Sequence, residues 1–231
     1  MKTETPDIYD DLQRKLMDAV FPPGEKLKPA DLQGEYGCSP NTIRDVLLRL
    51  SRVGLVEFEA QRGFRAKAVN IQVCNDITRF RILLEQEGTV WSMRKGGVAW
   101  EAKLSAAHYA LVHIERQIER EGDMQGHAGL WSDAEKSFHQ ILISACDSPI
   151  LQETHQNIYL QFRQQAVNMD RDFSEGYFAM IIAEHQVILD AVLDRDEESC
   201  RQAIHDHLKR NIVEPDNEVS ETKLRWQEIG A

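Results

Sequence analysis

The sequence predicts a mainly α-helical chain of two domains, with β structure confined to a hairpin near the N-terminus. Apolar residues recur at three- and four-residue steps through most of the chain, which is the period of an amphipathic helix. A strand–turn–strand pattern occupies residues 55–68, and strand signals stop after residue 71. The 231 residues allow a first domain of 69 residues and a second, larger core.

Residues 38–65 predict a helix followed by a two-stranded ribbon. Ser39 is a favourable N-cap, and Pro40 suits the first helical turn, where no backbone N–H is needed. Gly54 ends this helix, because glycine tolerates the left-handed conformation at a helix end. The buried face is expected to consist of Ile43, Val46, Leu47 and Leu50. Strands over 55–58 and 64–68 flank a turn at 61–63.

Residues 1–37 predict two further helices. Pro6 and Asp7 open the first, which a Pro-Gly turn at residues 21–24 ends. A short helix then spans residues 29–36, and Gly37 ends it. Three helices and a ribbon in this order are the outline of a winged helix-turn-helix, whose last helix enters a major groove while the wing contacts the DNA backbone. The alternative is an ordinary helix–hairpin unit with solvated arginines.

Residues 8–67 resemble the N-terminal domain of GntR-type transcriptional regulators. The matching positions include Pro23-Gly24, Leu27, Leu32, Gly37, Ser39, Ile43-Arg44-Asp45, Leu47, Leu50, Gly54-Leu55-Val56 and Arg62-Gly63. The resemblance implies binding to double-stranded DNA, with Arg44 at the position of the family's DNA-contacting arginine. The residues expected to contact DNA are Ser39, Asn41, Thr42, Arg44, Arg49, Arg62 and Gly63. Pro40 and Ala30 stand where the family often has arginine, so either the operator is expected to differ or nonspecific affinity is expected to be weaker.

Charge is unevenly distributed along the chain. The net charge is −11, yet residues 1–70 contain 11 basic and 11 acidic side chains. The acidic excess therefore lies in the second domain, and DNA is expected to meet only one face of the protein. The four scattered cysteines form no CxxC pair, which argues against a disulfide framework or a zinc ribbon. No signal peptide or membrane span is apparent, so a cytoplasmic protein is expected.

Six helices are predicted beyond residue 75, at about 76–95, 100–121, 131–146, 149–170, 175–194 and 197–213. Ser174 is expected to cap the fifth helix and Pro215 to end the sixth. Amphipathic helices with short connections favour an antiparallel bundle. The predicted division is a winged helix-turn-helix domain over 1–69, a linker over 70–75, a helical domain over 76–214 and a polar tail over 215–231.

Three of the eight histidines lie on otherwise apolar helical stripes, namely His139, His185 and His207. His185 and His207 lie at nearly equal distances from the turn at residues 195–196, so a helical hairpin brings them to the same height. Glu135 precedes His139 by one helical turn and shares its face. Three imidazoles and a carboxylate at one level of a bundle can bind a metal. The alternative is three hydrogen-bonded core histidines without metal.

Residues 76–212 resemble the FCD ligand-binding domain of FadR-type GntR regulators, on Phe80-Arg81, Glu85, Phe138-His139, Glu184-His185 and His207-Leu208. Metal-binding members use Asp-x-x-x-His and one histidine from each of the last two helices. The resemblance therefore implies His139, His185 and His207 as ligands, with Glu135 in place of the aspartate. The implied ion is divalent, zinc first, with nickel and manganese as alternatives.

The combined expectation is a ligand-responsive DNA-binding regulator, most simply a repressor. It is expected to act as a homodimer on a palindromic operator, because one small domain reads too little sequence. Open coordination positions on the metal suit a small carboxylate effector, which Arg81 and Arg163 are candidates to hold. Arg81 has an alternative role, an ion pair with Glu85 one turn away. The competing functions are a sensor of the metal itself and a metal-dependent enzyme with an appended DNA-binding domain.

Overall fold

The computed structural model describes residues 7–168 and 176–213. These residues fall into two compact units, which are described separately below. The N-terminal unit contains residues up to Cys74 together with the segment starting at Leu160, and the helical unit contains Asn75–Tyr159 and the segment up to residue 213. Ser174, Pro215 and the polar tail, on which parts of the predicted organisation rest, lie outside the described residues.

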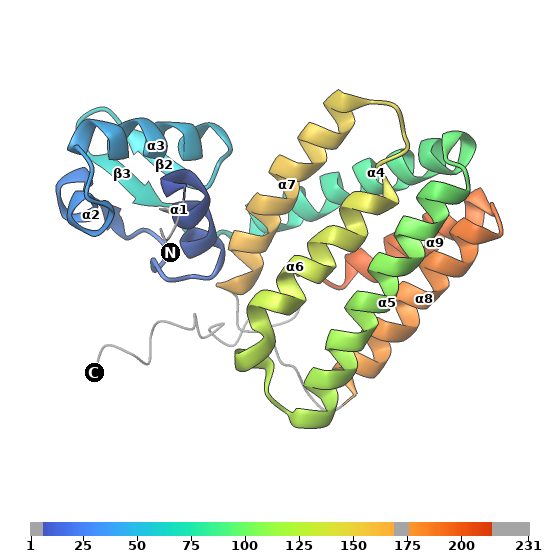
Figure 1. The fold of residues 1–231 in the computed structure, drawn as a ribbon. Helices are drawn as coiled ribbons and strands as arrows, with labels where there is room; N and C mark the ends of the chain where they lie inside the picture. The colour runs from blue at the N-terminus through green and yellow to red at the C-terminus, as the bar shows by residue number, and fades with distance from the viewer. Residues whose placement is uncertain (1–6, 169–175, 214–231) are drawn as a thin grey trace, which may run out of the picture. The chain divides into compact units, whose positions relative to one another are not determined.

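The N-terminal unit combines three helices with a small antiparallel sheet (Figure 1). The helices are α1 (Ile8–Met17), α2 (Pro29–Tyr36) and α3 (Pro40–Arg52), and the strands are β1 (Lys26–Leu27), β2 (Val56–Glu59) and β3 (Gly63–Ala66). The sheet order is β1-β3-β2. The winged helix-turn-helix prediction is confirmed, but strand β1 was not predicted, because two residues are too short to show an alternating pattern.

Local signals place these helices where the sequence predicts them. The Asp7 side chain accepts from the Tyr9 amide at the start of α1, and Ser39 accepts from the Thr42 amide at the start of α3. Gly37 and Gly54 adopt φ of 60° and 80° after α2 and α3. The four predicted apolar residues of α3 are all buried. The hydrophobic core of this unit therefore forms on the expected helix face.

The end of helix α7 (Pro149–Val167) belongs to the same unit. Leu160 joins its hydrophobic core. The Gln164 Nε2 donates to the Leu55 carbonyl at 2.9 Å, and the Gln165 Nε2 donates to the Ala68 carbonyl at 3.1 Å. These buried amides satisfy backbone carbonyls on either side of the β2–β3 hairpin, so the base of the wing is fixed by side chains from a distant part of the sequence.

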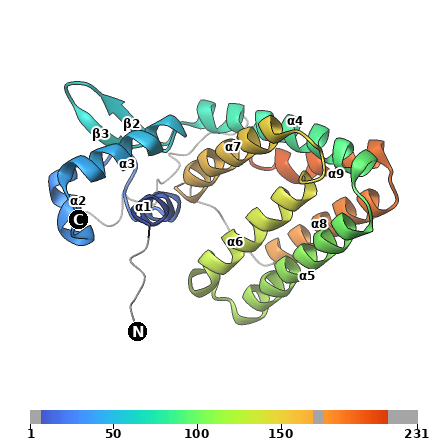
Figure 2. The ribbon, with the colours of Figure 1, turned by 45° about the horizontal axis from the view of Figure 1, so that its top comes forward.

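The helical unit contains α5 (Val98–Glu121), α6 (Met124–Leu142), α8 (Tyr177–Leu193), α9 (Glu197–Lys209) and most of α4 (Ile71–Lys95) and α7. Figures 1 and 2 show α8 and α9 as antiparallel neighbours joined by a short turn, with α5 beside α8. Their shared core includes Phe138, Ile188 and Ile204, all fully buried. The predicted bundle of amphipathic helices is confirmed.

Two helices begin more than two residues before their predicted starts. Helix α4 begins at Ile71, inside the segment predicted as a linker, because the Asn70 side chain caps it by accepting from the Val73 amide at 3.0 Å. Helix α6 begins at Met124, because Asp123 accepts from the Gly126 amide at 2.8 Å. Gly126 and Gly129 lie between the helices predicted at about 100–121 and 131–146, and both are helical in the structure. Within the described residues, no helix is long and apolar enough to cross a membrane.

We expect Gly54→Ala to destabilise the N-terminal unit by about 1–2 kcal/mol, because alanine is strained in the left-handed conformation at φ of +80°. The added Cβ would also lie 2.7 Å from the Gln161 side chain. Urea unfolding of the two proteins measures the difference in the free energy of unfolding. Gly34→Ala is the matched control. Gly34 lies in α2, and a Cβ added there has no atom within 4 Å. The free energy of unfolding of this control should therefore equal or exceed that of the wild type. Equal stability for Gly54→Ala and wild type would contradict the backbone argument.

Candidate metal centre and nucleic-acid interface

Helix α3 presents its polar face to solvent. Asn41 and Arg44 are exposed, and the hydroxyls of Ser39 and Thr42 lie 2.9 Å apart at the helix cap. The Arg44 guanidinium lies over the wing, 5.7 Å from the Phe58 ring centre and 5.8 Å from that of Phe64. These aromatic contacts orient Arg44 beside the β2–β3 hairpin, so helix and wing can meet one stretch of DNA together.

The remaining predicted DNA contacts lie apart from this group. The Arg49 guanidinium lies 4.2 Å from the Tyr9 ring centre, toward α1. Arg62 is exposed at the wing tip and forms an ion pair with Glu59 at 3.2 Å, while Gly63 adopts φ of +80° at the start of β3. An exposed pair of this kind is weak, so Arg62 can exchange Glu59 for a phosphate at small cost. The contacts of all seven residues with DNA stay a prediction.

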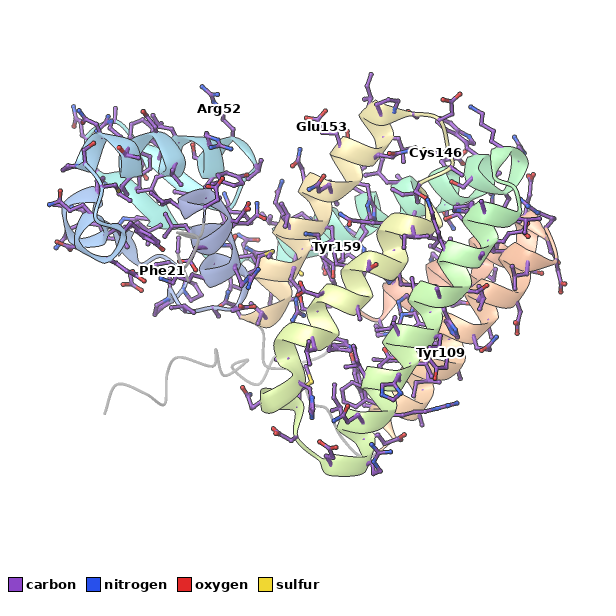
Figure 3. The ribbon with its side chains drawn as sticks, in the orientation of Figure 1. Phe21, Arg52, Tyr109, Cys146, Glu153 and Tyr159 are labelled. Carbon is purple, nitrogen blue, oxygen red and sulfur yellow. The ribbon has the colours of Figure 1, made fainter. Side chains whose placement is uncertain are left out.

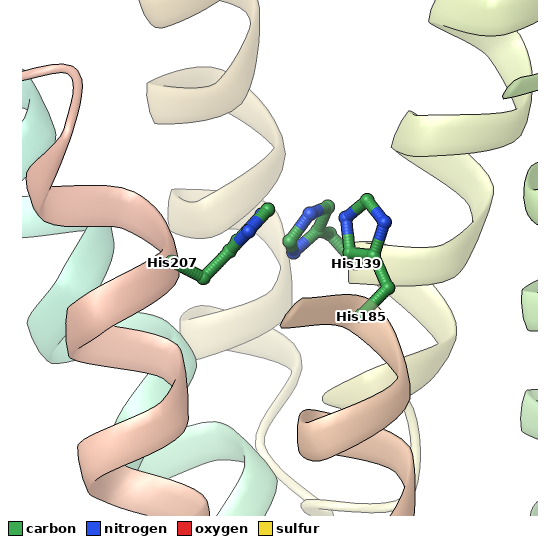
Figure 4. A group of neighbouring side chains, drawn as sticks. All are labelled: His139, His185 and His207. Atoms are coloured by element: carbon green, nitrogen blue, oxygen red, sulfur yellow. The ribbon is translucent and has the colours of Figure 1, made fainter. Parts of the chain in front are cut away.

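Three histidines from three helices meet in the interior of the helical unit (Figure 4). His139 comes from α6, His185 from α8 and His207 from α9. One nitrogen from each ring lies within 4.8 Å of the other two, and the His185 and His207 ring centres are 4.5 Å apart. His185 and His207 therefore meet across the α8–α9 hairpin, as their equal distances from its turn predict. Among the described residues, these histidines form the group suited to holding an ion.

Carboxylates surround the outer nitrogens of the triad. The His139 Nδ1 lies 2.7 Å from Glu85, and the His207 Nδ1 lies 2.9 Å from Glu184. The His185 Nδ1 lies 3.4 Å from Glu115, at ion-pair rather than hydrogen-bond distance. Carboxylate partners hold the proton on Nδ1 and leave the Nε2 lone pair for a metal. The Nε2 atoms of His139 and His185 have no hydrogen-bond partner within the described part of the chain.

The carboxylates that contact the outer nitrogens of the histidines were not predicted from the sequence. Glu115 lies on the same stripe of α5 as Leu111 and Ile118 and is fully buried. A charged residue on an apolar stripe was the available signal. Glu85 was considered only as a partner for Arg81. The contacts of Glu85 with α6 join positions 54 residues apart in sequence, and helical periodicity carries no information about that pairing.

Glu135 adjoins the triad without joining the three-histidine group. Its Oε1 lies 3.8 Å from the His139 Nε2 and 3.6 Å from the Arg81 Nη2. Its Oε2 accepts from the Tyr159 hydroxyl at 2.7 Å. Glu135 therefore lies on the predicted face next to His139, but its carboxylate is shared with Arg81 and Tyr159.

Arg81 takes the role that sequence reasoning gave as its alternative. Its side chain is fully buried, and its Nε donates to the Glu85 Oε1 at 2.6 Å. The guanidinium carbon lies 4.9 Å from the Tyr159 ring centre. Arg163 is also buried, but it lies in the part of α7 that belongs to the N-terminal unit. Their binding of an effector stays a prediction.

The protonation states of the centre follow from these contacts. Burial alone would raise the pKa of Glu85, but the Arg81 guanidinium and His139 hold it well below its usual range. Burial lowers the pKa of His139, an effect that Glu85 only partly opposes. Burial, reinforced by His185 and His139, lowers the pKa of His207 well below its usual value. Glu85 is thus a carboxylate, and His139 and His207 are neutral imidazoles, the form that binds metals.

A winged helix-turn-helix joined to an all-helical domain with a buried histidine cluster is the arrangement of a DNA-binding transcriptional regulator. The family model described as "Bacterial regulatory proteins, gntR family" matches residues 5–65, and that described as "FCD domain" matches residues 76–210. The chain belongs to the GntR family and carries an FCD domain. It is therefore a DNA-binding regulator and not an enzyme.

Relatives and solved structures agree with this assignment. The chain is 28% identical to the HTH-type transcriptional regulator BphR of Paraburkholderia xenovorans, over 88% of this chain and 82% of BphR. It is 25% identical to the regulator YdhC of Bacillus subtilis, over 90% and 92% of the two chains. The structure of Escherichia coli McbR/YncC has the same fold, with a TM-score of 0.71 and 21% identity over 88% of this chain and 92% of McbR.

We expect Arg44→Ala to weaken binding to a selected operator by about 10- to 100-fold, the loss of one base or backbone contact of about 1–3 kcal/mol. Fluorescence anisotropy at fixed salt, on an operator enriched from random DNA by the wild-type protein, measures the affinity. Arg14→Ala is the matched control, because Arg14 is an exposed arginine on α1 of the same unit. Equal losses in both variants would show that only overall charge matters.

The stability of the metal-free protein is expected to fall as the pH drops below the ordinary histidine value of 6.5. His139 and His207 have lower pKa values in the folded state, so the unfolded chain binds more protons in that range. Each such group contributes a slope of up to about 1.4 kcal/mol per pH unit. Urea unfolding in EDTA measures the slope, which should be shallower in His207→Gln. An identical slope in that variant would contradict the burial argument.

Proposed function

We propose that this regulator binds a divalent metal through His139, His185 and His207 and responds to a small organic acid that reaches the metal. The observation that carries the proposal is the convergence of three buried imidazoles whose outer nitrogens face carboxylates. For His139 and His207 this arrangement supplies neutral nitrogen donors with fixed tautomers. If these were core histidines without metal, both nitrogens of each ring would be expected to form hydrogen bonds. Neither nitrogen of the His185 ring forms one within the described part of the chain.

The charge around the triad also favours a cation. Four carboxylates lie within 4 Å of the three histidines, those of Glu85, Glu115, Glu135 and Glu184. Two guanidiniums accompany them: Arg81 pairs with Glu85, and Arg210 pairs with Glu184. The excess is two negative charges in a largely buried region, which is costly without compensation. A divalent ion supplies the compensating charge.

Three imidazoles suit zinc first, with nickel and manganese as alternatives, and leave coordination positions open. When bound, the metal supplies a Lewis acid that a carboxylate can ligate. Glu135 is positioned to ligate as well, provided its carboxylate leaves Arg81 or Tyr159. Arg81 is the proposed cationic partner of the acid. Acid binding would shift the helices of the bundle and so change DNA affinity, most simply by releasing a repressor homodimer from a palindromic operator.

We expect the His185→Ala protein to bind zinc more weakly. Substitution of residues that only support a metal ligand typically lowers affinity about 10–100-fold, and loss of a ligand should lower it further. Metal analysis of purified protein and competition with a fluorescent zinc chelator measure this. His205→Ala is the control, because His205 is an exposed histidine on α9 two residues from His207. Full metal occupancy in His185→Ala would remove His185 from the ligand set.

Operator binding with and without EDTA, and with acetate, lactate or citrate added to zinc-loaded protein, separates the two regulatory hypotheses. A response to metal and acid together supports the effector-controlled regulator. A response to zinc alone, unchanged by any acid, would instead make the metal the signal. Citrate also chelates zinc, so a matching excess of zinc is kept in that sample.

A further inference from the structure

A cleft of about 600 Å³ opens on the helical unit between the end of α6 and the start of α7. Glu153, labelled in Figure 3, lies on the α7 side of this cleft. The lining combines charged, amide and apolar side chains, and none of the three triad histidines belongs to it. The cleft is therefore distinct from the proposed metal centre. Its volume falls within the range of small-molecule sites.

His155 gives this cleft a specific polar group. His155 lines the cleft but is fully buried. Its Nε2 lies 3.0 Å from the Glu85 Oε1. Because Glu85 is ionised and can only accept, the proton of a neutral His155 ring lies on Nε2, which leaves Nδ1 as an acceptor. This Nδ1 has no hydrogen-bond partner among the described residues. A buried acceptor left unsatisfied costs about 1–3 kcal/mol, so the position favours a ligand that donates an O–H or N–H.

In the rest of the lining, Lys136 can pair with a carboxylate, and Glu153 can accept from a hydroxyl or ammonium group of the same ligand. Lys136 contributes an ammonium group, and no ion pair of Lys136 occurs within the described parts of the chain. Gln140 and Gln156 add amides that can donate or accept. Ile141, Ile143 and Pro149 supply an apolar surface for a short carbon chain. A small acid with a hydroxyl or amino group next to its carboxylate satisfies all three features.

We propose that this cleft is a second ligand site, which takes a small hydroxy acid or amino acid whose hydroxyl or amino group donates to the His155 Nδ1 and whose carboxylate pairs with Lys136. Glu85 connects the site to the proposed metal centre, because its two oxygens contact His155 and His139. A donor on Nδ1 makes the His155 N–H a stronger donor to Glu85. Glu85 then holds the His139 proton less strongly, which makes His139 a weaker metal ligand.

The site is tested in full-length, EDTA-treated protein, so that acid binding at the metal does not contribute. Glycolate, L-lactate, L-serine and L-threonine are titrated separately, and the side-chain ¹⁵N resonances of labelled histidines are followed. At least one probe should shift the His155 Nδ1 resonance saturably. Lys136→Gln should weaken that binding by about tenfold, as expected for a charge-assisted hydrogen bond. Lys103→Gln, an exposed lysine on α5 outside the cleft lining, should leave it unchanged.

Two results would overturn the cleft site. One is the absence of any His155 response to all four acids at millimolar concentration. The other is a response that Lys136→Gln leaves unaltered, which would place the acid elsewhere or assign only water to Nδ1. These titrations contain no metal, so they stand even if the metal centre proposed above fails.

The connection through Glu85 has its own readout and rests on the proposed metal function. Zinc affinity should fall about fivefold when the probe saturates the cleft, the lower range of coupling between two sites. The probe should bind zinc-loaded protein more weakly by the same factor. Equal zinc affinities with and without a bound probe would overturn the coupling while leaving the cleft site in place. If the wild-type protein bound no zinc, the proposed metal-binding function itself would be wrong.

Discussion

The ionised carboxylate of Glu85 is the group on which the helical unit depends. A fully buried carboxylate is costly unless charges and hydrogen bonds compensate it. Arg81, His139 and His155 all contact its two oxygens, at 2.6, 2.7 and 3.0 Å. These partners come from α4, α6 and α7, so one side chain fixes three helices in register. Removing it would leave a buried arginine charge without its closest partner.

The same contact organises the proposed chemistry. Glu85 sets the tautomer of His139 and so turns the Nε2 lone pair toward His185 and His207. Glu184 does the same for His207 from the neighbouring hairpin helix. The centre is therefore prepared before any ion arrives, which lowers the reorganisation that binding requires. Charge is also divided along the chain: residues 1–70 are neutral and contain the arginines predicted to contact DNA, while the acidic excess lies in the residues that follow.

Predictions from sequence succeeded where a short-range signal exists. Ser39 and Gly37 mark helix ends through local hydrogen bonding and φ, and both are found as expected. The equal spacing of His185 and His207 from one turn predicts their meeting, because a hairpin has a fixed rise per residue. The misses have physical causes too. Gly126 lies outside the predicted helices, but the Asp123 cap overrides its low helix propensity. Two-residue β1 exists only because β3 offers it a partner.

By itself the sequence determined the fold class, the order of the elements and the residue types that could bind DNA or metal, because periodicity, caps and turn residues act over a few positions. The tertiary structure alone decided which polar groups share the interior. In it, Arg81 pairs with Glu85, Glu135 contacts both Arg81 and Tyr159, and Glu115 lies next to His185. These pairings join residues far apart in the chain. They follow from which buried charges must be compensated once the helices have packed, a condition that no local pattern records.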